Sequence, residues 1–237
     1  DVYKRQEKAR EIIHDIKNTV TVKTEKLFSY GFMCIFVGVM LSVFQQAVGI
    51  NAVLYYAPRI FQDMGMGNPM VQTVIMGVVN ISFTLVAVFT VEKLGRKPLL
   101  IFGSIGMAVG ALGVALTFGN AALSTVTMIS IMVYSASFMF SWGPIAWVLI
   151  AELFPNTIRG AAVAIAVAFQ WIFNFIVSST FVPMFNMHLT PGDDFGHWFT
   201  YGLYGVICIL AAIFVWKLVP ETKGKTLEDM SKLWRKE

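Results

Sequence analysis

Long runs of residues without Asp, Glu, Lys or Arg are the feature of this sequence that most constrains its fold. They cover residues 27–58, 64–91, 98–151, 160–192 and 195–216. A helix that crosses a bilayer needs about 20 mostly apolar residues. The run 98–151 would extend roughly 80 Å as a single helix, whereas the hydrocarbon core is only about 30 Å thick. This run must therefore cross twice, and "FGNAA" at 118–122 favours a turn between the two crossings.

The composition agrees with a membrane protein. Of the 237 residues, 57% are hydrophobic and 14% are charged, whereas soluble domains carry about 25% charged residues. The sequence therefore predicts an all-α membrane protein with six transmembrane helices, whose first partner is the lipid bilayer. The net charge of +4 does not indicate a nucleic-acid partner, because the basic residues flank the apolar runs and form no patch.

The distribution of Lys and Arg predicts the orientation. All 18 of these residues except Arg59 fall in segments that would lie on the same side of the membrane as both termini. Loops rich in Lys and Arg face the cytoplasm. We therefore expect a multi-pass protein of the cell (inner) membrane with both termini cytoplasmic.

This topology divides the chain into three segments. Residues 1–26 are expected to form a cytoplasmic segment with a short amphipathic helix, and residues 27–217 a six-helix transmembrane bundle. Residues 218–237 should form a cytoplasmic tail with a short helix over "TLEDMSKLW", for which Thr226 is a candidate N-cap. Residues 1–6, "DVYKRQ", look like a junction artefact and carry no argument.

The spans lack the groups that catalysis would need. No His, Asp, Glu, Lys or Arg lies in the middle of a run, and the sequence shows no metal-ligand spacing, nucleophile–base pair or phosphate loop. Cys34 and Cys208 stand alone in apolar surroundings and are expected to be buried thiols. We therefore expect no enzyme, no catalytic residue, no metal and no cofactor.

Large neutral amides interrupt three of the runs instead. They are Gln45, Gln46, Asn51, Asn80, Gln170 and Asn174. Buried amides cost free energy unless they are paired, so one interpretation is hydrogen bonding between helices, as in a structural membrane subunit. The alternative is a site for a neutral sugar. Amides match the hydroxyl groups of a sugar, and nearby aromatic rings such as Trp142, Trp171 and Tyr55 could cover its apolar face.

Glycine and proline positions bear on how these amides could meet. Gln45 and Asn51 would not share a face of an unbroken helix, so we predict a distortion near Gly49 that brings both to one cavity. Pro144 removes a backbone hydrogen bond inside the fourth span. The third span carries a glycine stripe that predicts close packing between helices: Gly103, Gly106, Gly110 and Gly113.

Four longer motifs resemble those of one transporter family. They are "QQAVGINAVLYYAP", "VEKLGRKPL", "SWGPIAWVLIAELFPNTIRG" and "VPETKGKTLEDM". Their order and spacing resemble the second half of a sugar porter of the major facilitator superfamily, over nearly all of the chain after about residue 7. The resemblance implies the C-terminal bundle of a twelve-helix fold. Such a protein transports sugar by alternating access, and the missing N-terminal six-helix half would be the partner of this chain.

The resemblance also implies functional residues. The substrate-binding set carried over by motif is Gln45, Gln46, Asn51, Tyr55, Asn80, Trp142, Gln170 and Trp171. A cytoplasmic gate, formed as an ionic lock, is implied for Arg96, Glu152 and Arg159, beside Glu92, where the family usually has Asp. The alternative for Arg96 is simple anchoring at the inner membrane surface.

The cargo is less constrained than the family. The resemblance favours D-xylose carried together with a proton, while a hexose or another pentose, by symport or uniport, stays open. A proton carrier should be an ionisable residue that faces a cavity in the membrane. No such residue is found in the spans of this chain, so the resemblance implies that the carrier lies in the missing half.

Overall fold

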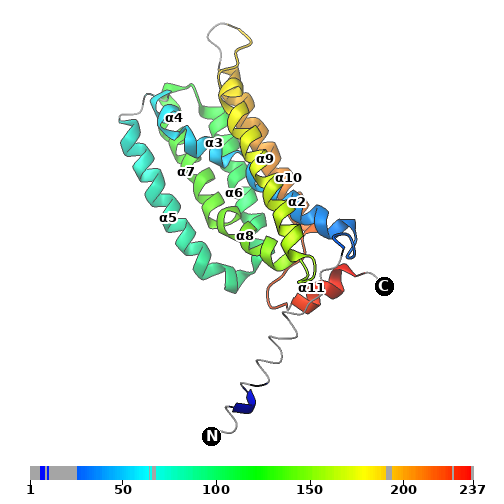
Figure 1. The fold of residues 1–237 in the computed structure, drawn as a ribbon. Coiled ribbons are helices and arrows are strands. Elements are labelled where there is room, and N and C mark those ends of the chain that lie inside the picture. Colours follow the sequence, from blue (N-terminus) through cyan, green and yellow to red (C-terminus); the bar gives the residue numbers. More distant parts are fainter. Residues whose placement is uncertain are drawn as a thin grey trace.

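The computed structural model is a bundle of membrane-length helices (Figure 1). It describes residues 6–8, 10, 26–63, 65, 68–190, 194–225 and 227–235. The elements are α2 (Phe32–Ala47), α3 (Ile50–Tyr55), α4 (Ala57–Asp63), α5 (Pro69–Leu94), α6 (Arg96–Thr117), η1 (Ala121–Leu123), α7 (Ser124–Phe140), α8 (Trp142–Leu153), α9 (Arg159–Phe185), α10 (Phe195–Leu218) and α11 (Leu227–Trp234). Since these ranges contain no strand, the all-α prediction is confirmed.

Six segments of the described chain are long and apolar enough to cross a membrane, as the sequence predicts. They are Phe32–Tyr55, Pro69–Leu94, Arg96–Thr117, Ala121–Leu153, Arg159–Phe185 and Phe195–Leu218. The predicted turn is also present, because α6 ends at Thr117 and Gly119 adopts a φ of +87° before η1 begins. The C-terminal helix is α11. Most of the predicted N-terminal amphipathic helix, and the N-cap Thr226, lie outside the described residues.

Each helix of the bundle packs against particular neighbours (Figure 1). Helix α6 lies between α7 and α10, while α2 contacts α9 and α8. Helix α5 packs on α7 and forms one edge of the bundle in this view. At the lower end, α11 contacts α8, and the indole Nε1 of Trp234 donates a hydrogen bond to the Leu153 carbonyl over 3.1 Å.

The glycine stripe of α6 packs directly on α7. A Cβ at Gly110 would lie 2.6 Å from the backbone nitrogen of Tyr134, and one at Gly113 would lie 2.6 Å from Ser130 Oγ. Gly103 and Gly106 meet small serine side chains of the same region in the same way. Small residues on both helices let the backbones approach closely, which is how helices associate in lipid. The predicted close packing is confirmed.

Two spans are broken at the positions that the sequence indicated. Helix α2 ends at Ala47, and α3 begins only at Ile50. Between them, Gly49 adopts a φ of +87°, a conformation that residues with a Cβ rarely take. The fourth span breaks at Ser141, and Pro144 lies in the first turn of α8, where its missing N–H costs least. The distortion predicted near Gly49 is therefore confirmed.

The packing predicts a large difference between two glycine substitutions. Gly110→Ala should destabilise the protein by about 1–3 kcal/mol, because backbone atoms of α7 occupy the space of the new methyl group. Gly202→Ala in α10 is the control, since nothing lies within 4 Å of its Cβ position. Thermal unfolding in detergent measures both variants. Equal melting temperatures would contradict the packing argument.

Candidate functional site

A cavity of about 420 Å³ opens on the broken helices, and most of the predicted amides line it. Helices α2 and α3 supply Gln45, Gln46, Asn51 and Tyr55. The rest of its wall is Thr84, Phe138, Met139, Gly143, Pro144, Trp147, Gln170, Trp171 and Asn174. This volume is within the usual range for small-molecule sites.

Four amides form one hydrogen-bonded cluster. Gln46 Oε1 accepts hydrogen bonds from Asn51 Nδ2, at 2.6 Å, and from Asn174 Nδ2, at 2.9 Å. Gln46 Nε2 donates to Gln45 Oε1 over 3.4 Å. The break at Gly49 is what lets Asn51 reach back to Gln46, since an unbroken helix would turn the two away from each other.

A second set of contacts ties this cluster to α9 and α8. Gln170 Nε2 donates to Gln45 Oε1, and Gln45 Nε2 donates to the carbonyl of Trp142 over 3.2 Å. The oxygen of the Gln170 amide is buried without a hydrogen-bond partner among the described residues. An unpaired buried acceptor of this kind is costly, and a ligand with hydroxyl groups would satisfy it.

The structure corrects the prediction for tryptophan. Trp142 is 0% exposed, and its Nε1 donates to the Leu100 carbonyl and to Ser104 Oγ on α6, at 3.2 and 2.7 Å. Its side chain is therefore part of the core. Trp147 lines the cavity instead and is 45% exposed. The sequence held a signal for this, because Gly143 and Trp147 are four residues apart and share a face of α8.

Asn80 is the second predicted contact that lies outside the cavity. Its Oδ1 accepts a hydrogen bond from Ser135 Oγ of α7 over 2.7 Å, and the residue is buried. This contact joins α5 to α7, which is the helix-pairing role that the sequence left open as an alternative. Asn80 and Trp142 are therefore packing residues in this structure.

The cavity suits a neutral polar ligand. Amides that donate and accept line one part, while Trp147, Trp171 and Tyr55 offer exposed ring faces. The described residues around it include no Asp, Glu, Lys, Arg or His. A charged ligand would require a counter-charge in a membrane cavity, so a neutral polyhydroxylated molecule fits better.

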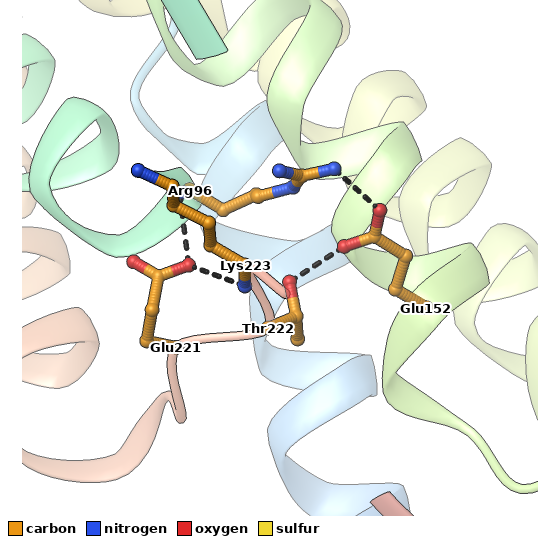
Figure 2. Close-up of polar contacts among 5 residues, drawn as sticks. All are labelled: Arg96, Glu152, Glu221, Thr222 and Lys223. Carbon is orange, nitrogen blue, oxygen red and sulfur yellow. Dashed lines mark hydrogen bonds and ion pairs between the residues drawn. The ribbon is translucent and has the colours of Figure 1, made fainter. Parts of the chain in front are cut away.

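A polar network joins the start of α6 and the end of α8 to the C-terminal tail (Figure 2). Arg96 Nη2 and Glu152 Oε1, two of the predicted gate residues, form an ion pair at 2.8 Å. Thr222 Oγ1 donates to the other oxygen of Glu152 over 2.5 Å. The carboxylate of Glu221 accepts from the backbone N–H groups of Arg96 and Lys97, each at 3.0 Å.

Glu221 is a residue that the sequence reasoning missed. A carboxylate on the first N–H groups of a helix satisfies donors that have no partner within the helix, and it complements the positive end of the helix dipole. The signal was its place in "VPETKGKTLEDM", directly after the last span. Its contacts fix the start of α6 to the tail.

The other predicted gate residues do not join this network. Arg159 Nε donates to the Phe154 carbonyl over 3.3 Å, and its Nη2 is buried without a hydrogen-bond partner among the described residues. Glu92 is exposed, and it makes no hydrogen bond or ion pair with any other residue that the structure describes. Of the three residues predicted for the lock, the structure pairs Arg96 with Glu152, while Arg159 folds back on the loop that precedes its own helix.

The network predicts that Glu221→Gln destabilises the protein by about 0.5–2 kcal/mol, because the charge on the helix start and one strong acceptor are lost. Glu92→Gln is the matched control and should change stability by less than about 0.5 kcal/mol. Melting temperatures in detergent test both. A larger loss for Glu92→Gln than for Glu221→Gln would contradict the assignment.

Comparisons with known proteins agree with these features. The chain is 50% identical over 214 residues to the D-xylose-proton symporter of Escherichia coli K12, which covers 90% of this chain and 43% of that protein. It is 41% identical over 211 residues to the glucose facilitated diffusion protein of Zymomonas mobilis, which covers 88% of this chain and 44% of that protein. The chain thus spans less than half the length of these relatives.

The fold is also similar to that of a solved structure. The major facilitator superfamily proton:xylose symporter XylE, bound to 6-bromo-6-deoxy-D-glucose, superposes with a TM-score of 0.76 at 50% identity. The match covers 85% of this chain and 42% of that one. The family model described as "Sugar (and other) transporter" matches residues 2–234. The chain therefore belongs to the sugar transporter family of the major facilitator superfamily.

Proposed function

We propose that this chain is the C-terminal six-helix half of a sugar transporter and that its amide-lined cavity binds the sugar. The observation that carries the proposal is the cavity itself, in which paired amides and exposed aromatic rings meet and no charged side chain is found among the described lining residues. The fraction of each relative that the chain covers supports a missing N-terminal half. That half would close the cavity from the opposite side.

The proposed sugar contacts keep six residues of the predicted set, leave out Asn80 and Trp142, and add Trp147 and Asn174. The full set is Gln45, Gln46, Asn51, Tyr55, Trp147, Gln170, Trp171 and Asn174. The unpaired oxygen of Gln170 would accept a sugar hydroxyl, and the indole rings would cover its apolar face. No group in this set is suited to catalysis, which agrees with transport of an unmodified sugar.

The proposed cycle is alternating access. Two bundles rock about a sugar held near the middle of the membrane, so that the site faces one side at a time. The ion pair of Arg96 with Glu152 lies at the cytoplasmic end of this half and would stabilise a closed inner face. We place residues 1–26 and 218–237 in the cytoplasm and residues 27–217 in the inner membrane, as the distribution of Lys and Arg predicts.

D-xylose with a proton is the proposed cargo, because the relative that is 50% identical is a D-xylose-proton symporter. A hexose carried by facilitated diffusion is the second candidate, favoured by the 41% identity to a glucose facilitated diffusion protein. The proton carrier would lie in the N-terminal half, since no ionisable carboxylate or imidazole lines the cavity in the described residues.

Uptake of labelled D-xylose by the full-length protein, in cells that lack other xylose carriers, tests this function. We expect accumulation that collapses with a protonophore and competes only weakly with glucose. Uptake that equilibrates and ignores the protonophore would mean facilitated diffusion. A well-expressed protein that moves neither xylose nor a hexose would leave the structural membrane subunit as the better account.

The two tryptophans of α8 allow the site to be separated from the core. Trp147→Ala should weaken sugar binding about three- to tenfold, which corresponds to the free energy of one aromatic contact, and should change the melting temperature little. Trp142→Ala should instead destabilise the fold by about 3–5 kcal/mol, because the residue is fully buried. Binding and melting of the purified full-length protein measure both. Selective loss of binding in the Trp142 variant alone would reverse the assignment.

A further inference from the structure

The break between α2 and α3 is held by a tyrosine from another helix. The hydroxyl of Tyr134 in α7 donates a hydrogen bond to the backbone carbonyl of Val48. In an unbroken helix, that carbonyl would accept from the amide four residues further on. Tyr134 is fully buried, so the bond is shielded from water. The phenol thus occupies the place of a backbone donor at the point where the helix is interrupted.

A second tyrosine packs on the same break. A Cβ at Gly49 would collide with the ring of Tyr204 from α10, so this ring lies directly against the glycine backbone. Neither Tyr134 nor Tyr204 lines the cavity, and both are buried. Two tyrosines from α7 and α10 therefore support the break from outside the cavity.

The backbone at 48–49 determines how two site amides face each other. Gln46 lies just before the break and Asn51 just after it, and Asn51 Nδ2 donates to Gln46 Oε1 over 2.6 Å. A rotation at Val48 or Gly49 would separate these side chains. It would also disturb the bond from Asn174 to the same oxygen of Gln46.

We propose that Tyr134 is a positioning residue for sugar binding, whose hydroxyl fixes the break at Val48 and Gly49 and thereby the relative placement of Gln46 and Asn51. This inference rests on the proposed function, because that function assigns sugar binding to the amides of the cavity. Tyr134 touches no substrate and acts through the backbone. Its own chemistry is one buried hydrogen bond.

Tyr201 provides a matched control. It is also fully buried, and its hydroxyl has no hydrogen-bond partner among the described residues. Tyr134→Phe and Tyr201→Phe therefore remove the same atom from similar surroundings, but only the first leaves a backbone carbonyl without its donor. The comparison separates the hydrogen bond from general effects of a change in the core.

Two measurements on the full-length protein test the inference. Hydrogen exchange of the backbone amides at 46–53 should accelerate in Tyr134→Phe and stay unchanged in Tyr201→Phe. D-xylose binding should weaken about tenfold in Tyr134→Phe alone, as expected for the loss of one buried hydrogen bond. Combined with Asn51→Ala, Tyr134→Phe should cause little further loss, because both variants remove the same amide arrangement.

Several results would overturn the inference. They are unchanged exchange at 46–53 in Tyr134→Phe, equal loss of binding in both phenylalanine variants, or an effect fully additive with Asn51→Ala. If the unmodified protein binds no sugar, the proposed function fails. Hydrogen exchange then still decides whether Tyr134 holds the break, because that readout needs no ligand.

Discussion

The rest of the structure depends on the requirement that backbone N–H and C=O groups within a bilayer find partners inside the protein. Continuous helices meet it along most of each span. At the two interruptions, side-chain hydroxyl groups take over. Tyr134 of α7 donates to the Val48 carbonyl at the first break, and Ser141 donates to the Ser137 carbonyl at the second. Each break is thus stabilised by a side-chain donor, and both lie beside the cavity.

These interruptions also create the site. The break at Gly49 turns Asn51 toward Gln46, and the start of α8 directs Trp147 rather than Trp142 to the cavity. Amides paired with one another cost less to bury than single amides, and they still keep lone pairs and protons for a ligand. A neutral cavity of this kind can bind and release an uncharged molecule without a charge left unpaired in the membrane.

A different interaction holds the end of the bundle where α6 begins and α8 ends. Charged side chains there join segments that are far apart in the chain. Glu221 of the tail caps α6, while Glu152 of α8 pairs with Arg96 and Thr222 (Figure 2). The tail therefore connects α6 to α8, the helix that carries Trp147 into the cavity.

The sequence by itself determined the elements: six spans, the turn at 118–122, the break at Gly49 and the close packing of α6. Apolar length, charge placement and glycine act locally, so no partner is needed to predict them. Only the tertiary structure decided which side chains meet. It placed Trp142 and Asn80 in the packing, brought Trp147 to the cavity and left Arg159 outside the ion pair of Arg96 with Glu152. The direction of a side chain depends on the helix that faces it, and a single sequence does not specify that neighbour.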